Sequence, residues 1–156
     1  MLTRELRIDE ESEEHCMGYG AHLSGKIKSF GNDDVRFSLL GGSGIGRYLG
    51  TSFFPGAVIE ADGSLTPQSS FGGHLAYQHH WQRNLRSNLV AGYIETDNEL
   101  SLETLDKSAS SIHVDLQYSP VANLLFACEY IHAKRTLENG DNGTLDRLYL
   151  HASYDF

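Results

Sequence analysis

The final stretch of the chain, residues 145–156 (LDRLYLHASYDF), alternates between apolar and polar side chains with a period of two. One face carries Leu148, Leu150, Ala152, Tyr154 and Phe156, and the other carries Arg147, Tyr149, His151, Ser153 and Asp155. This period indicates a β-strand with one apolar face and not a helix. The stretch is about as long as the roughly 9–11 residues that a strand needs to cross a bilayer. It therefore predicts a strand that separates an apolar from an aqueous environment.

The same alternation recurs along most of the chain. It predicts strands over 18–28, 34–42, 71–81, 86–95, 111–118 and 124–131, and residues 2–8 form a candidate first strand. Five acidic residues between positions 9 and 14 are most simply a solvated loop, which we place at residues 9–17. The chain thus divides into residues 1–17, with a candidate first strand and the acidic loop, and residues 18–156, a portion of one barrel.

The connections between these strands alternate in length. Those near 29–34, 82–85 and 119–123 are short, whereas those near 50–68, 97–108 and 136–144 are long. Outer-membrane barrels have short periplasmic turns at one end and longer extracellular loops at the other. The glycines at 41, 42, 44 and 46 predict a bend or a place where backbones approach closely. We predict an all-β, antiparallel, up-and-down transmembrane β-barrel wall of seven to eight strands.

The alternation alone leaves open which face meets water. In a membrane barrel the apolar face meets lipid, and the sheet must close because every backbone polar group needs a partner in hydrocarbon. A soluble lipocalin-like barrel binding a small apolar ligand would turn the same pattern inside out, and a small structural barrel or adhesin would hold no pore. Aromatic residues near strand ends favour the membrane barrel, because they would crowd a small interior.

Composition and motifs limit the other functional classes. The net charge of -9 argues against nucleic acid as a partner. No apolar run approaches the ~18 residues of a membrane helix. Gly42-x-Gly44-x-Gly46 does not open a helix after a parallel strand, and no nucleophile motif occurs, so we predict neither an enzyme nor a cofactor. Cys16 and Cys128 lack metal-type spacing, and their pairing is left open.

The segments GYGAHLSGKIK, DVRFSLLGG, FGGHLAYQHHW, LRSNLVAGY and LYLHASYDF carry a resemblance to a known family. Together they resemble the C-terminal half of a bacterial general-porin-type barrel, and most of all the DcaP-like porins. The terminal Tyr-x-Phe is similar to the assembly signal of outer-membrane barrels. The resemblance implies a homotrimer of sixteen-stranded barrels in outer-membrane lipid, with passive diffusion of small anions such as dicarboxylates. No signal peptide is visible after Met1, so either the chain is cytosolic or it is the C-terminal piece of something longer, and the resemblance agrees with an N-terminal truncation.

Cationic side chains outnumber acids on the polar faces of the strands. The candidate lumenal, anion-selecting residues are Lys26, Lys28, Arg36, Arg86 and Arg147, against Asp115, Glu129 and Asp155. Basic rings select anions in pores, although each cation could instead pair with an acid on a neighbouring strand. The polar faces also carry His22, His74, His80, His113 and His151. These lack metal-ligand spacing, so we predict lumenal lining and no metal site.

Overall fold

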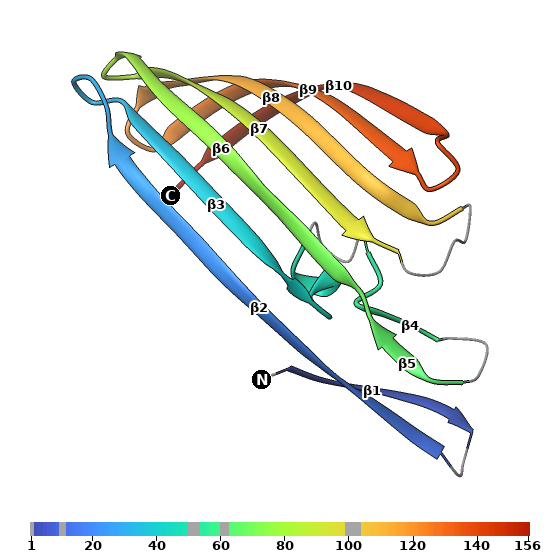
Figure 1. Ribbon diagram of the computed structural model, residues 1–156. Helices are drawn as coiled ribbons and strands as arrows, with labels where there is room; N and C mark the ends of the chain where they lie inside the picture. Colours follow the sequence, from blue (N-terminus) through green and yellow to red (C-terminus); the bar gives the residue numbers. More distant parts are fainter. Residues whose placement is uncertain (1, 10–11, 50–53, 60–62, 99–103) are drawn as a thin grey trace.

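The computed structural model describes residues 2–9, 12–49, 54–59, 63–98 and 104–156, and the side chains from residue 16 onward. Its main element is a curved sheet of eight strands in the order β1-β2-β3-β6-β7-β8-β9-β10 (Figure 1). These strands are β1 (Leu2–Asp9), β2 (Ser12–Lys28), β3 (Asp34–Ser43), β6 (Ser69–Gln82), β7 (Leu85–Asp97), β8 (Asp106–Val121), β9 (Leu124–Leu137) and β10 (Asn142–Tyr154). The connection between β3 and β6 holds the 3₁₀ helix η1 (Gly46–Tyr48) and a two-stranded pair, β4 (Ala57–Ile59) and β5 (Leu65–Pro67).

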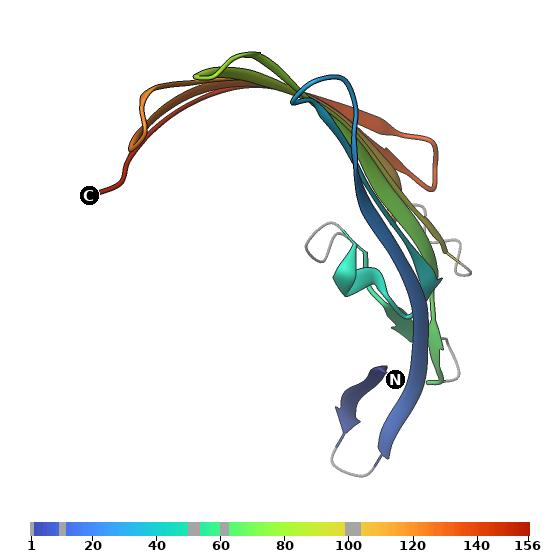
Figure 2. The same ribbon diagram turned by 90° about the vertical axis from the view of Figure 1, so that its left-hand side faces the viewer.

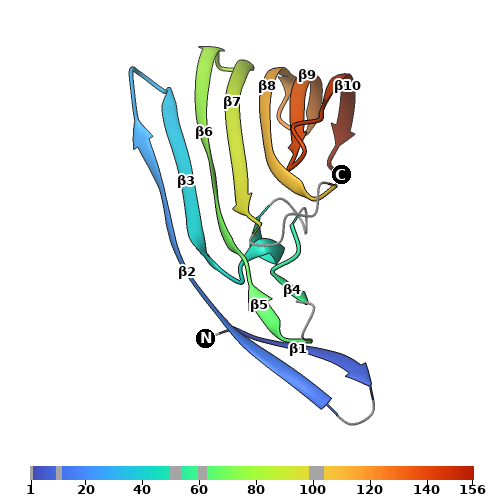
Figure 3. The same cartoon turned by 45° about the vertical axis from the view of Figure 1, so that its right-hand side comes forward.

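The predicted all-β, antiparallel, up-and-down architecture is confirmed. Each strand of the main sheet pairs antiparallel with the next one, and the candidate first strand is present as β1. Among the described residues the sheet does not close, so β1 and β10 form its two edges. Figure 3 shows the strands side by side, with β1 and the first part of β2 extending beyond their neighbours.

Two predicted connections are wrong. We placed an acidic loop at residues 9–17, but β2 begins at Ser12 and pairs with β1 across most of that range. The connection predicted at 136–144 is also too long, because β9 continues to Leu137 and β10 begins at Asn142. In both places the polar residues extend a strand beyond its apolar part, which a hydrophobic pattern cannot reveal.

The short turns lie together at one end of the sheet, as predicted. β2 and β3 are joined by residues 29–33, β6 and β7 by 83–84, and β8 and β9 by 122–123. The chain terminus lies at the same end, since the backbone N–H of Asp155 donates to the carbonyl of Asn123 (3.0 Å). The insertion between β3 and β6 lies at the opposite end (Figure 1).

The apolar side chains of the strands lie on one face of the curved sheet, and the polar side chains lie on the other. Leu116, Tyr118 and Phe126 are 48%, 44% and 46% exposed. Their side chains lie on the convex face of the sheet, whereas η1 packs on the concave face, against positions of the polar parity (Figure 2). A soluble barrel would bury these apolar side chains in its centre, so the lipocalin-like alternative is wrong.

Rows of paired residues on the convex face show how the apolar band runs across the strands. One row stays apolar or aromatic from β2 to β10: Ile27, Val35, Tyr77, Leu89, Val114, Tyr130 and Leu148. A second row turns polar toward β10: Leu23, Leu39, Gly73, Tyr93, Ser110, Lys134 and Thr144. Barrel strands tilt by roughly 35–45°, so a row perpendicular to them climbs through the membrane and leaves it at one side.

Two further observations concern the cysteines and the helices. Cys16 and Cys128 are free thiols, so the question of a disulfide is answered for this structure. In the part of the chain that is described, no helix has the length and hydropathy needed to cross a membrane.

Candidate functional site

The concave face of the sheet carries the only compact apolar core among the described residues. Its buried side chains are Ile45, Leu49 and Phe54, which are 2%, 4% and 2% exposed. All three belong to the connection between β3 and β6, which we call the inserted segment (residues 44–49 and 54–59). Gly44 turns the chain inward with a φ of +74°, a conformation that favours glycine. The inserted segment therefore folds back over the polar wall (Figure 2).

Two glycines of the wall make room for the inserted segment. A Cβ at Gly20 would lie 2.9 Å from a methyl group of Ile45, and one at Gly72 would lie 2.7 Å from a methyl group of Leu49. Carbon atoms do not approach so closely without displacement, so only glycine at these positions allows the two side chains to pack flat on the strands. At Gly42 a Cβ would lie 2.1 Å from the carbonyl of Tyr19, which confirms the close approach predicted for the glycine cluster.

The far end of the insertion is held by a buried amide. Gln68 is fully buried, and its Nε2 donates to Oδ1 of Asn98 (2.6 Å), which follows β7. Asn98 in turn donates through Nδ2 to Oε1 of Glu138 (2.7 Å), which follows β9. Three connections at the same end of the sheet are thus tied together by side-chain hydrogen bonds.

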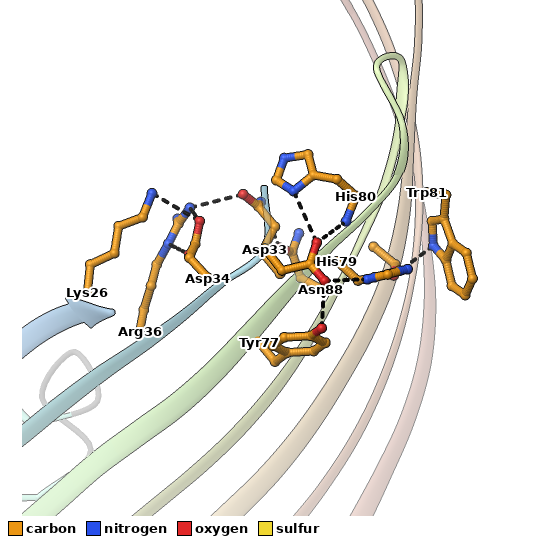
Figure 4. A network of polar contacts seen from close by, with 11 residues as sticks. Lys26, Asp33, Asp34, Arg36, Tyr77, His79, His80, Trp81 and Asn88 are labelled. Atoms are coloured by element: carbon orange, nitrogen blue, oxygen red, sulfur yellow. Dashed lines mark hydrogen bonds and ion pairs between the residues drawn. The ribbon is translucent and has the colours of Figure 1, made fainter. Parts of the chain in front are cut away.

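All five predicted cations lie on strand positions of the concave face, and two of them share one carboxylate. Nζ of Lys26 lies 3.0 Å from Oδ2 of Asp34, and Nε of Arg36 donates to Oδ1 of the same residue (2.6 Å) (Figure 4). Asp34 is only 3% exposed. Two positive side chains thus meet one negative side chain at Asp34.

A chain of hydrogen bonds continues from Arg36 across the sheet. Nη2 of Arg36 donates to Gln78 (3.1 Å), and Nε2 of Gln78 donates to Asn88 (2.9 Å). Nδ2 of Asn88 then donates to Asp115 (2.9 Å). Asp34, Gln78, Asn88 and Asp115 are successive partners across four strands, so their register places these polar ends side by side.

The other three predicted cations are less closely connected. Nε of Arg86 donates to Gln117 (2.8 Å), whose amide reaches Asp115 and so joins the same network. The guanidinium of Arg147 lies 5.3 Å from the ring centre of Tyr149, a cation–π arrangement. Lys28 forms no ion pair with any described residue. The structure therefore brings together Lys26 and Arg36, connects Arg86 through amides, and leaves Lys28 and Arg147 apart.

Two of the five histidines predicted to line the lumen form side-chain hydrogen bonds. His22 is hydrogen-bonded through Nε2 to Ser38 (2.9 Å). Nδ1 of His113 lies 2.9 Å from Glu129, and its Nε2 lies 3.2 Å from Ser111. Across the described ranges, no group of three or more histidine, cysteine, aspartate or glutamate side chains could hold a metal ion.

Asp33 fixes the turn between β2 and β3 against the neighbouring hairpin. Its carboxylate accepts hydrogen bonds from the backbone N–H of His80 (2.8 Å) and from the hydroxyl of Tyr77 (2.7 Å), and it lies 2.6 Å from Nδ1 of His79 (Figure 4). These bonds, the His80 N–H first, hold the pKa of Asp33 well below its usual range. The short-turn end is thus anchored by one ionised carboxylate.

Sequence reasoning missed two residues of the site. Arg47 and Tyr48 belong to η1, are exposed, and lie with η1 on the concave side. The glycine cluster before them was the available signal, since it indicated a close approach without saying which face the chain would cross.

A curved, meandering antiparallel sheet with an apolar convex face and a polar concave face is the wall of a transmembrane β-barrel. The chain belongs to the DcaP outer membrane protein family, whose model matches residues 1–156. It is accordingly a protein of the bacterial outer membrane.

A solved structure shares this fold. The outer membrane channel DcaP of Acinetobacter baumannii superimposes with a TM-score of 0.83 at 19% sequence identity, over 94% of this chain. The chain spans 42% of the length of that channel. Among curated proteins, no sequence matches significantly.

Proposed function

We propose that this chain supplies part of the wall of an outer-membrane diffusion channel that admits small hydrophilic anions, such as dicarboxylates. The single observation that carries the proposal is the concave face, where Lys26 and Arg36 share one carboxylate. Lysine and arginine side chains that line a pore favour anions, and low-dielectric walls strengthen their field.

The inserted segment supports the same function. It lies on the same concave side as these cations, toward the end of the sheet away from the short turns, and contributes Arg47, a further positive side chain. A segment that crosses a lumen narrows it, so a passing solute is brought closer to the charged wall. Solutes move down their gradient, and no covalent step is involved. The proposed assembly is a homotrimer of closed barrels in outer-membrane lipid.

Ion selectivity tests the proposal. The protein that carries this chain is reconstituted in planar bilayers, and the reversal potential is measured across a KCl gradient. We expect current steps with chloride preferred over potassium. Replacing both Lys26 and Arg36 by glutamine should reduce that preference severalfold. Lys134→Gln, on the convex face, is the matched control and should change nothing.

Solute flux tests the substrate class. In liposome swelling, succinate should enter faster than a neutral solute of similar size, because the wall attracts its charge. Absence of current steps would refute a channel. Unchanged selectivity in the double variant, or equal rates for succinate and the neutral solute, would refute the role given to these cations.

A further inference from the structure

Between the inserted segment and the wall lies a hollow of about 460 Å³, which we call the lumenal pocket. Its sides are Tyr48 and Leu49 of the inserted segment and the concave faces of β2, β3, β6, β7, β8 and β9. Small-molecule sites are typically concave, of ~300–1,000 Å³, mostly apolar, with a few polar groups that fix orientation. The lumenal pocket has this size and composition.

The two ends of the lumenal pocket differ in chemistry. One end has His22, Ser38 and His74 on three adjacent strands, with His22 bonded to Ser38 and Ser38 paired with His74. The other end has small or branched apolar side chains on the next three strands, namely Ile94, Ala109 and Ala133, together with Ser111, whose hydroxyl is bonded to Nε2 of His113. A ligand with a polar and an apolar end matches this division.

The groups at the polar end determine whether it suits an anionic or a cationic ligand group. None of the described residues that line the lumenal pocket is an aspartate or a glutamate. Arg36 lies one position along the concave face from Ser38, and its guanidinium is bonded to Asp34 and Gln78. Glu129 is kept away from the pocket, because His113 stands between it and Ser111. The polar end offers imidazole and hydroxyl groups that can donate hydrogen bonds and no described carboxylate, so it suits a carboxylate and not a cationic group.

We propose that the lumenal pocket binds small monocarboxylates with an aromatic or short aliphatic body. This proposal rests on the proposed channel function and adds a binding site beside the path of the solutes that pass through. The carboxylate lies at His22, Ser38 and His74, and the apolar body lies against Leu49 and Ile94. A dicarboxylate passes through the lumen but fits the pocket less well, since its second charge would be desolvated at the apolar end without a partner.

Glycine at position 92 provides a steric test. A Cβ there would meet Ser111 Oγ at 3.4 Å, an ordinary contact, so a leucine at this position fills the hollow without displacing the backbone. Gly143, in β10, is the matched control: it lies at a position of the same face, outside the lumenal pocket, and a Cβ there meets nothing within 4 Å. His74→Leu is a second variant, which removes a polar side chain from the end of the pocket that binds the carboxylate.

The experiment measures block of single-channel current by sodium benzoate, sodium succinate and benzyl alcohol. We expect benzoate to reach half-block at a concentration at least tenfold below that of succinate. Gly92→Leu should raise the benzoate value at least tenfold, and Gly143→Leu should leave it unchanged. His74→Leu should weaken benzoate severalfold while leaving benzyl alcohol unaffected.

The outcomes separate this proposal from the channel itself. Two results overturn the proposal that the lumenal pocket binds monocarboxylates: an anion-selective current that succinate and benzoate block equally, or a benzoate block that survives both Gly92→Leu and His74→Leu. Either result leaves the channel proposal intact. If no current steps occur, the channel proposal fails. Titration of the refolded protein with benzoate, followed by the imidazole NMR signals of His22 and His74, then decides: shifts support the pocket, and their absence overturns it.

Discussion

Apolar side chains gather in two regions of this molecule, and their exposure is opposite. On the convex face of the sheet Leu150 is 72% exposed, whereas Ile45 of the inserted segment is 2% exposed. Both are branched aliphatic residues, so residue type does not explain the difference. The convex face meets lipid, which is as apolar as leucine itself, while the inserted segment meets water in the lumen unless it packs on the wall.

The comparison teaches that two separate conditions hold the wall in place. The convex face depends on the surrounding bilayer and on strict alternation along each strand. The inserted segment depends on Gly20 and Gly72, which lie on strands distant in sequence and leave space for its side chains. A change to one region should therefore leave the other intact.

The largest expected effect is a charge on the convex face. Leu150→Arg places a guanidinium in the apolar band of β10, at a cost of about 2–4 kcal/mol near the bilayer midplane. His151→Arg is the matched control, since the adjacent residue points to the concave side. Unfolding by urea in lipid vesicles should show a clear loss of stability for Leu150→Arg only. Equal losses for both variants would contradict the assignment of the faces.

A smaller and local effect is expected in the inserted segment. Leu49→Ala removes buried methyl groups and should weaken packing by about 2–5 kcal/mol. Hydrogen exchange at residues 46–49 should accelerate, and single-channel conductance should rise as the segment leaves the lumen, while global unfolding changes little. Ile59→Ala, at an exposed position of β4, serves as the control. Unchanged exchange in Leu49→Ala would show that the segment is held by other contacts.

The smallest expected effect concerns the anchor of the short turn. Because folding lowers the pKa of Asp33, its contribution to stability is present above the ordinary carboxyl pKa of about 4 and is lost as the pH falls below that value. Asp33→Asn should remove this part of the pH dependence, whereas Asp155→Asn should preserve it. Unfolding midpoints between pH 2 and pH 6 measure the difference. Parallel pH profiles for wild type and Asp33→Asn would contradict the proposed role of ionised Asp33 in holding the turn.

The strands of the main sheet and their two faces could be predicted well from the sequence. Alternation identified every strand of the main sheet and assigned Leu116 and Gln117 to opposite faces, because a strand shows each face in its local pattern. It failed where a strand continues through polar residues, as at Ser12 and Asn142. Exposed strand ends carry no apolar pattern to read.

The inserted segment could not be predicted in the same way. Its core forms between Ile45, Leu49 and glycines of β2 and β6, and contacts between distant strands leave no periodic signal. The five predicted cations share the concave face, as their parity along the strands indicated, yet the sharing of Asp34 by Lys26 and Arg36 depends on the register of β2 against β3. Their role in anion selection stays a prediction.

The most direct test of the central claim is the environment of two adjacent positions in β8. Nitroxide labels are attached at Leu116→Cys and, separately, at Gln117→Cys, in vesicles and with Cys16 and Cys128 replaced by serine. Collision with oxygen, which dissolves in lipid, and with a water-soluble nickel complex is then compared. The account predicts that the label at 116 collides mainly with oxygen and the label at 117 mainly with nickel. The reverse pattern, or equal access at both positions, would contradict it.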